Sequence, residues 1–489
     1  MISLFVFLLL CGVCLLMYGQ VKIDFLSKKI FLISFLIKLI YGFIFIFIYK
    51  YWIGNGVLSG DVSDFFNDAK VISLIASESP LNYIKVLFGF IDDTSPEIWE
   101  FVKHTNVWEY IGLNELLNDN RLIIKFNSVI HLFSNNNVYV HSMVHSFLSF
   151  TGIVLIYLAF KDLVENKKMF WIILIILPSI SFWGTSILKE SLMIFSIGLF
   201  CFGWYNFYKN KYLVSSFILF LSVLLLVFNK PYVGIVIVPI SLLFMIGYLF
   251  NWSVMVAKIT LASVLIGFVL IIIIPNRLNV INRLSFRQQE MIDLSKGGVV
   301  FLNDSAFCKF DYDFINNFEK VNDSLIKINS DTQGQYKLFG TKEYKNYKFE
   351  SNTLACLNYS SNPPSNSYFE SQIIGNSKLN LLKSVPLTLV NVLIRPFPWD
   401  NGGSLKIFSF LQNILIFMFI VISIFKRRSL RDIEKWVLLI LTLSSLFIIL
   451  LIGWTTPIFG TIIRYKRPVD LFLIIIGFIM LKSKQHGKI

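Results

Sequence analysis

The sequence predicts an all-α polytopic membrane protein with about eleven transmembrane helices and two large extracytoplasmic loops. Three observations predict this fold class. Of the 489 residues, 55% are hydrophobic, and the mean hydropathy is +0.68. Apolar runs of about 18 residues or more recur along the chain, and such a run can cross a hydrocarbon core of roughly 30 Å. The basic residues fall mostly in short connections between these runs, where Lys and Arg determine the orientation of a membrane protein.

The N-terminal run MISLFVFLLLCGVCLLMY is the first predicted spanning helix. It has no basic region before its apolar stretch and no small-residue cleavage site, so a secretory signal peptide is not expected. Cys11 and Cys14 lie inside the apolar stretch, where a thiol packs as a small hydrophobic group rather than binding a metal ion.

The predicted spans place the short basic connections on one side of the membrane. Connections such as KDLVENKK (161–168) and KRRSLR (426–431) are then cytoplasmic, the N-terminus is outside and the C-terminus is inside. The net charge of +14 is therefore attributed to the basic connections that orient the chain in the membrane, and no nucleic-acid partner is expected. The spans cover approximately residues 2–18, 30–52, 139–160, 169–184, 190–207, 213–229, 232–250, 257–275, 405–425, 434–453 and 468–482.

Two long connections divide the chain. Residues 1–275 form an N-terminal membrane module that includes the first outer loop at 53–138. Residues 276–404 form a polar extracytoplasmic loop or small subdomain, and residues 405–489 hold the C-terminal membrane helices. The first loop is acidic, with eleven Asp and Glu against five Lys and Arg, and its aromatic amphipathic pieces suit helices in the headgroup layer. Whether Cys308 and Cys356 of the second loop form a disulfide is left open.

The first loop begins with GDVSDFFNDAK (60–70), directly after an apolar segment. Asp61, Asp64 and Asp68 would share one helix face. Asp61, and Asp64 after it, are the candidate catalytic carboxylates, because a carboxylate can accept the proton of an acceptor hydroxyl. Asp68 is expected to cap the helix or bind water.

Charged residues also occur next to apolar segments, where burying a charge costs free energy. FWGTSILKESL places Lys189 and Glu190 at the junction of two apolar segments, after Pro178 has ended the preceding helix. The pair could belong to an interfacial helix cap, in which Glu190 favours the helix N-terminus. It could equally line a cavity, since ionisable residues at membrane depth face protein or water. Both interpretations stay open, and the pair is a candidate substrate-binding site.

Two further segments carry candidate substrate-binding residues. NVLIRPFPWDNGG resembles a re-entrant or interfacial turn that keeps Arg395 and Asp400 polar. GTIIRYKRPVDLF places Arg464, Lys466 and Arg467 on the outer side, against the positive-inside tendency. A bound anion explains these cations better than solvation does, and Arg binds phosphate oxygens through a bidentate fork.

Carboxylates and cations on the outer face together suit glycosyl transfer from a polyprenyl-phosphate-linked sugar. The carboxylate would take the proton of a glycan or lipid acceptor, and the cations would neutralise the phosphate as the glycosidic bond breaks. No Gly-rich nucleotide loop, Ser-His-Asp order or zinc signature appears. A divalent Mg or Mn ion is left open as a cofactor. His141 and His145 have metal-ligand spacing, but no nearby acid completes a set, so a packing role is favoured.

The layout resembles that of the GT-C fold glycosyltransferases. A long outer loop beginning GDVSDFFNDA follows the second helix, six further helices come next, and a second long outer loop follows them. The resemblance implies an acidic residue early in the first loop, best matched by Asp61 and then by Asp64. It also implies a bilayer-embedded enzyme of cell-envelope glycan assembly in the bacterial cytoplasmic (inner) membrane, with its active site facing the periplasm or the outside. The chain departs from the pattern in having an additional first helix and no adjacent acidic pair.

Other functions remain open. An O-antigen type polysaccharide polymerase also has many helices and a large outer loop, and the spacing of Arg287 and Gly298 matches an Arg-x10-Gly pattern of some such polymerases. A lipid or glycan transporter or flippase is a different class, although the spans hold few acids and few paired Gly or Pro breaks. A membrane scaffold is the remaining alternative.

Overall fold

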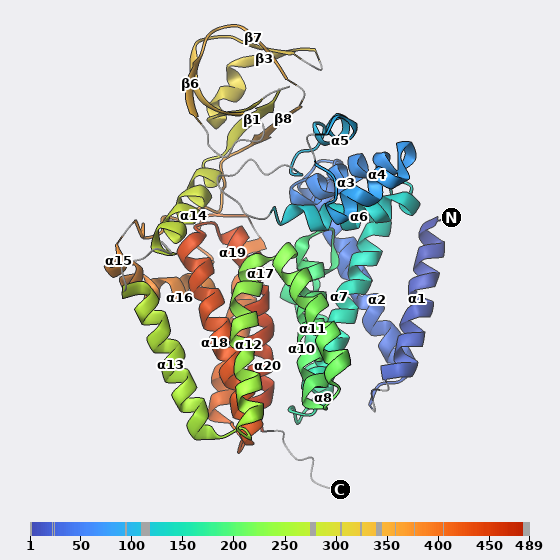
Figure 1. Ribbon diagram of the computed structural model, residues 1–489, viewed down its shortest axis with the longest axis vertical. Helices are drawn as coiled ribbons and strands as arrows, with labels where there is room; N and C mark the ends of the chain where they lie inside the picture. Colours follow the sequence, from blue (N-terminus) through green and yellow to red (C-terminus); the bar gives the residue numbers. More distant parts are fainter. Residues whose placement is uncertain are drawn as a thin grey trace. The chain divides into compact units, whose positions relative to one another are not determined.

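The computed structural model of the chain is mostly helical (Figure 1). It describes residues 2–21, 23, 25–92, 95–108, 118–273, 280–303, 306–322, 325–338, 345–356, 358–375, 377–403 and 405–482. The chain divides into two compact units. The first unit comprises Met1–Phe7, Ile46–His141 and Ile292–Asn366, and the second comprises Leu8–Phe45, Ser142–Met291 and Ser367–Ile489.

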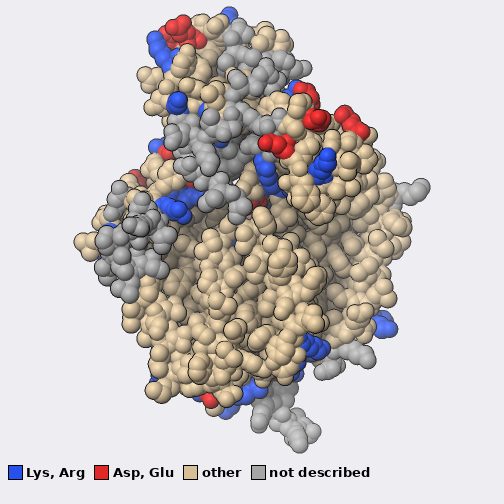
Figure 2. All heavy atoms as spheres, viewed as in Figure 1, with Lys and Arg blue, Asp and Glu red and all other residues tan. Residues whose placement is uncertain are grey.

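Eight helices in the described residues are long and apolar enough to cross a membrane. Each coincides with a predicted span, and Figure 2 shows a band without Lys, Arg, Asp or Glu across the helices drawn in the middle of the view. The protein is therefore a multi-pass membrane protein by its helix composition. The eight are α1 (Ile2–Val21), α2 (Lys28–Phe47) extended by η1 (Ile48–Trp52), α7 (Val138–Phe160), α10 (Lys189–Tyr208), α11 (Tyr212–Asn229), α12 (Pro231–Leu249), α17 (Leu405–Phe425) and α18 (Asp432–Thr455).

The other three predicted spans differ from straight, full-length helices. The span at 169–184 is bent by 54° between α8 (Lys167–Ile176) and the pair α9 (Pro178–Ser181) and η2 (Trp183–Thr185), because the proline ring interrupts the helix. In α13 (Val254–Ile273) the apolar helix Val254–Val269 is shorter than a full span, and α20 (Arg467–Met480) has only 14 residues. Eight described helices, or nine if the bent pair is one span, are thus long and apolar enough to cross a membrane, whereas about eleven spans were predicted.

Close packing of α7 against α10 fixes the position of α10 within the second unit. A Cβ atom at Gly198 of α10 would overlap the backbone of Gly152 on α7, and one at Gly152 would overlap the backbone of Ile194. Small residues let membrane helices approach in this way. Further packing joins α10 to α11, α12 to α18, and α20 to both α17 and α18. The second unit also contains α15 (Lys378–Lys383), α16 (Val385–Leu393) and α19 (Phe459–Tyr465), and it holds the part of α14 (Val280–Ser295) up to Met291.

Short helices occupy the described part of the first large loop, in the first unit. Gly60 precedes α3 with a φ of 66°, a left-handed conformation that favours glycine. Ser79 caps α4 by accepting a hydrogen bond from the Asn82 N–H, and Pro80 occupies the first turn. Two of these helices, α4 and α5, fall in the amphipathic pieces predicted for this loop, although 109–117 lies outside the described residues. The helices of the loop are α3 (Asp61–Glu78), α4 (Pro80–Phe88), α5 (Pro96–Val102) and α6 (Asn120–Ser134).

Two antiparallel sheets form within residues 298–362, where the all-α prediction expected none. One sheet has the strand order β6-β5-β2-β1-β8 and the other β3-β4-β7, with η3 (Tyr312–Asn316) between β2 and β3. The prediction missed them because β1 pairs with β8, almost 60 residues further along the chain. The strands are β1 (Gly298–Leu302), β2 (Ala306–Phe310), β3 (Phe318–Asn322), β4 (Leu325–Ile328), β5 (Thr332–Leu338), β6 (Lys345–Phe349), β7 (Thr353–Ala355) and β8 (Asn358–Asn362).

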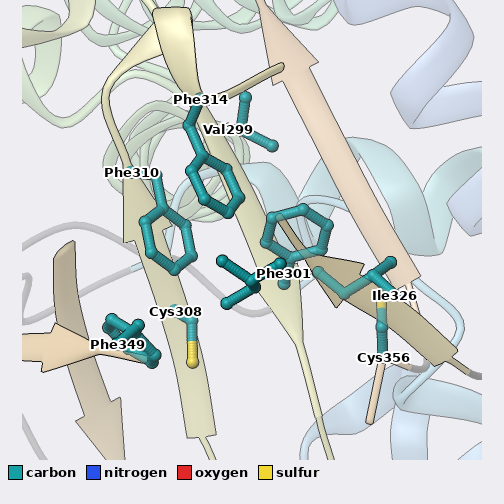
Figure 3. Packing of buried hydrophobic residues seen from close by; sticks show 9 residues of the cluster. Val299, Phe301, Cys308, Phe310, Phe314, Ile326, Phe349 and Cys356 are labelled. Atoms are coloured by element: carbon teal, nitrogen blue, oxygen red, sulfur yellow. The ribbon is translucent and has the colours of Figure 1, made fainter. Parts of the chain in front are cut away.

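An aromatic core holds the two sheets together (Figure 3). Phe310 stacks on Phe314 with ring centroids 3.9 Å apart, and Phe301 packs edge-on against Phe314. Cys308 and Cys356 are buried in this core, and no disulfide joins them. Residues 298–362 therefore form a small antiparallel β-structure with its own hydrophobic core.

Candidate functional site

The second unit contains a buried ion pair where three of its helices begin or end. The turn after η2 leads into α10, and the Glu190 side chain in the first turn of α10 is fully buried. Lys230, between α11 and α12, brings its Nζ to 3.3 Å from Glu190 Oε1. Arg464 near the end of α19 places its Nε 3.5 Å from the same oxygen. The Asn229 side chain also donates a 2.7 Å hydrogen bond to the Lys189 carbonyl, which ties the end of α11 to the start of α10.

The corner between α19 and α20 adds three more buried charges. Arg467 Nη1 lies 3.2 Å from Asp470 Oδ2, and Lys466 Nζ lies 3.7 Å from Asp470 Oδ1. The three side chains are no more than 4% exposed. Burying charges is tolerated only when they are paired, so this arrangement is more than a solvated loop. We call Glu190, Lys230, Arg464, Lys466, Arg467 and Asp470 the ion cluster.

Aromatic rings border the ion cluster. The guanidinium carbons of Arg464 and Arg467 lie 5.8 and 5.7 Å from the centre of the Trp183 ring. Lys230 Nζ lies 4.5 Å from the centre of the Tyr465 ring, against which Tyr232 also packs. Rings in these positions stabilise cations and exclude water from one side of them.

A second polar group connects to the ion cluster through Asn413, which is buried in α17. Lys466 Nζ donates to Asn413 Oδ1 at 2.6 Å and to the Val392 carbonyl at 3.1 Å. Asn413 Nδ2 in turn donates to the Arg395 carbonyl at 2.9 Å. Asn413 therefore fixes the position of the segment after α16 relative to the start of α20.

Arg395 and Asp400 form the bidentate pair expected of a guanidinium and a carboxylate. Arg395 Nε donates to Asp400 Oδ2 at 2.9 Å, and Nη2 lies 2.5 Å from Oδ1. Burial raises the pKa of Asp400, but hydrogen bonds from Arg395 and from the Phe397 N–H, with the positive charge of Arg395, hold that pKa below its ordinary value. The pair shapes the turn and leaves Asp400 ionised at neutral pH.

The ion cluster has more cations than anions among its members, four against two. Lys189 at the start of α10 is a further buried cation of the same unit. The Nε of Arg467 is buried and makes no hydrogen bond to any residue that the structure describes. A buried donor of this kind is normally satisfied by water or by a ligand acceptor. The cluster is therefore suited to an anionic group, and Arg464, whose side chain is 20% exposed, is its most accessible cation.

The candidate carboxylates lie in the first unit, on the first turns of α3. Asp68 accepts hydrogen bonds from the N–H groups of Asn106, Val107 and Trp108 at 2.7 to 3.0 Å, so it holds the segment after α5. Its pKa is raised to about 6 by burial, which outweighs these three donors. Asp68 thus binds the backbone of residues 106–108, whereas the sequence predicted that it would cap the helix or bind water.

Asp61 and Asp64 differ in environment. Asp61 is exposed at the first position of α3, and Asp64 is half-buried one turn later. Burial, followed by the charges of Asp61 and Asp68, raises the pKa of Asp64 to about 7. A carboxyl group with such a pKa can exchange a proton near neutral pH, which is the property required of a general acid or base.

Arg287, His141 and His145 contact other partners than the members of the ion cluster. Arg287 on α14 pairs with Glu290 one turn later at 2.7 Å. His141 lies within hydrogen-bond distance of Asn127 and Ser134, and His145 of Ser191. Among the described residues, no three His, Cys, Asp or Glu side chains are grouped to hold a metal ion.

Three members of the site were missed in the sequence. Lys230 gives no local signal, because its partner Glu190 lies 40 residues away. Asp470 could have been found, since its spacing of three from Arg467 and four from Lys466 is that of helical ion pairs. Asn413 could also have been found, because an amide in the middle of an apolar span is uncommon and is often functional or structural.

Comparison with known proteins gives no further assignment. No protein-family model, curated protein or solved structure matches the chain.

Proposed function

We propose that the protein is a membrane glycosyltransferase that takes a sugar from a polyprenyl-phosphate-linked donor and transfers it to a glycan or lipid acceptor. The observation that carries this proposal is the ion cluster, in which buried cations outnumber carboxylates at the ends of apolar helices. A phosphate attached to a hydrophobic chain combines the two properties that such a place recognises, a negative charge and a lipid tail.

The cations would act on the leaving group. In glycosyl transfer the acceptor oxygen forms a bond to the anomeric carbon while the bond from that carbon to the phosphate oxygen breaks, and the bonding pair remains on the phosphate. Arg464 is the cation best exposed to a substrate, and its position against Trp183 limits its movement. Preorganised cations stabilise the charge that develops on the leaving phosphate without having to reorient during the reaction.

The carboxylates of α3 would act on the acceptor. Asp61 is the proposed general base, which takes the proton of the acceptor hydroxyl as the new bond forms. Asp64 is the second candidate, supported by its pKa of about 7. On the topology predicted from the Lys and Arg distribution, the reaction takes place on the extracytoplasmic face. The resemblance to the GT-C glycosyltransferases implies that the membrane is a bacterial inner membrane.

A transfer assay tests the proposal. The purified full chain in lipid vesicles is supplied with a panel of radiolabelled polyprenyl-phosphate and polyprenyl-diphosphate sugars, and transfer to glycan or lipid acceptors is measured. Replacing Arg464 with Ala should lower kcat/KM by roughly 100-fold, as loss of one charge-stabilising donor does. Arg464→Lys should recover only part of this, because the bidentate fork is lost. Lys435→Ala, which removes an exposed cation paired with Asp432 on α18, is the matched control.

The products separate the neighbouring functions. Addition of a single sugar supports the glycosyltransferase, whereas a ladder of products that lengthens with time would identify a polymerase. Binding of a lipid-linked donor without transfer to any acceptor would contradict the proposal and favour a transporter. Full activity of the Arg464→Ala protein would show that the ion cluster takes no part in the reaction.

A further inference from the structure

A cavity of about 310 Å³ lies inside the second unit, between α7, α10, α12, α18 and α20. Its volume is at the lower end of the range for ligand pockets. None of the residues that line it belongs to the ion cluster. Its deep part is lined by apolar side chains such as Ile197 and Phe200 of α10 and Phe472 of α20. An aqueous solute would gain little from such walls, whereas a hydrocarbon chain would fit them.

The cavity is elongated along α10. Residues of α10 that line it recur every three or four positions, which places them on one face of the helix. They extend from Ile197 to Tyr208 at the end of α10, a rise of about 16 Å at 1.5 Å per residue. Half the thickness of a hydrocarbon core is about 15 Å, so the cavity reaches from one end of the bundle to its middle.

Polar groups line the end of the cavity where α7 and α10 end and α18 begins. They are Asp162, Tyr205, Lys209 and Arg431. Lys209 Nζ lies 5.5 Å from the centre of the Tyr205 ring and 4.0 Å from Asp162 Oδ2, so it is held only loosely by the carboxylate. The ion cluster lies at the start of α10, and this polar group lies at its end. Two separate polar sites therefore occur about one membrane thickness apart.

The connections at this end are strongly basic. Segments 161–168 and 426–435 together contain eight Lys and Arg against four Asp and Glu, and Lys209 lies at the same end. Figure 2 shows Lys and Arg side chains gathered at the lower edge of the uncharged band. Basic pockets between transmembrane helices bind the head groups of anionic lipids, while the chain lies in the apolar part.

We propose that this cavity is a binding site for an anionic glycerophospholipid, with one acyl chain between α10, α12 and α18 and the phosphate near Lys209. This lipid is not the substrate of the proposed transfer reaction, and its binding does not depend on that reaction. The charge of the polar end selects an anionic over a zwitterionic head group, and the apolar depth selects a chain over a soluble phosphate.

Photolabelling of the purified full chain tests the site. The probe is a phosphatidylglycerol with a photoreactive group in one acyl chain, compared with the phosphatidylcholine analogue, and labelled peptides are mapped by mass spectrometry. Phosphatidylglycerol should label α10, α12 or α18, and Lys209→Gln should reduce that labelling about fivefold. Lys211→Gln, two residues away and outside the cavity lining, is the matched control.

Filling the cavity provides a second test. Ser241 of α12 lines the cavity, and Ser241→Phe should reduce labelling of these helices roughly tenfold or more, because the ring occupies the space of the chain. Ser263→Phe on an exposed face of α13 is the control and should leave labelling unchanged. If Ser241→Phe fails to fold, the Lys209 comparison decides. Equal labelling by phosphatidylcholine, or equal labelling of the Lys209→Gln and Lys211→Gln proteins, would overturn the proposal.

Discussion

Replacing Glu190 with Gln should destabilise the protein strongly, because it leaves two cations beside a neutral amide. The Glu190 side chain is 1% exposed, with Lys230 Nζ at 3.3 Å and Arg464 Nε at 3.5 Å from Oε1. Lys230 is almost equally buried, with 4% of its side chain exposed. It therefore cannot recover its hydration when the carboxylate is removed.

The size of the effect follows from these distances. At an effective dielectric constant of about 20, two unit charges 3.3 Å apart attract each other by about 5 kcal/mol. Much of this attraction offsets the desolvation of the charges, so the pair as a whole contributes little net stability. Removing only one partner, however, leaves the other uncompensated. We expect Glu190→Gln to lower the free energy of unfolding by about 3 to 5 kcal/mol.

A double-mutant cycle with Lys230→Met measures the interaction. The free energy of unfolding is determined for the parent, both single variants and the double variant by equilibrium unfolding in mixed micelles. The double variant removes the pair together, so it should be more stable than Glu190→Gln alone, with a coupling energy of about 2 kcal/mol. If the effect of the double variant equals the sum of the two single effects within about 0.5 kcal/mol, the carboxylate and the ammonium do not interact, and the proposed ion pair of Glu190 and Lys230 is refuted.

Four further predictions concern the reaction, pH, packing and topology. Asp61→Asn should lower the transfer rate about 10²- to 10⁴-fold in the vesicle assay, and a loss no larger than that of Asp64→Asn would exclude Asp61 as the base. Burial raises the pKa of Asp64 from 3.8 to about 7, so the folded protein holds this proton more tightly than the unfolded chain does. The melting temperature should therefore fall as the pH rises from about 4 to about 7, and Asp64→Asn should make this fall smaller. Gly198→Ala should lower the free energy of unfolding by about 1 to 3 kcal/mol, because its Cβ overlaps backbone of α7, and an unchanged melting temperature would refute this contact. In a cysteine-free background, an impermeant maleimide should label a cysteine at 330 but not one at 165 in intact cells, and the reverse result would invert the predicted orientation.

The membrane helices could be predicted closely because the signal is local. The expected span at 213–229 is observed as Tyr212–Asn229, and that at 434–453 as Asp432–Thr455. An apolar run bounded by polar residues is sufficient for such a prediction, since lipid requires every backbone group to be bonded within the helix. The sheets of residues 298–362 could not be predicted in this way, because their strands are short and pair with distant segments.

The candidate site could be predicted only in part, for the same reason. Glu190 and Arg464 were each identified as charges in unfavourable places, and the structure brings them together. Lys230 reaches Glu190 because α10 packs against α11, and no pattern of neighbouring residues in the sequence predicts this packing. The charge of an isolated residue is visible in the sequence, but the partner that satisfies it depends on the tertiary fold.

The ion cluster also has a consequence for how the chain is made. Glu190 and Lys230 are translated early, whereas Arg464 and the charges of α20 follow about 235 residues after Lys230, which is roughly 12 to 47 seconds of synthesis at about 5 to 20 residues per second. During that interval the nascent chain holds Glu190 and Lys230 at a helix end with their final partners absent. A ribosome-bound chain that already includes Lys230 but not yet α19 and α20 should therefore keep contact with the insertion machinery and with membrane chaperones. A chain that stops before them should be recognised by membrane proteases as incomplete.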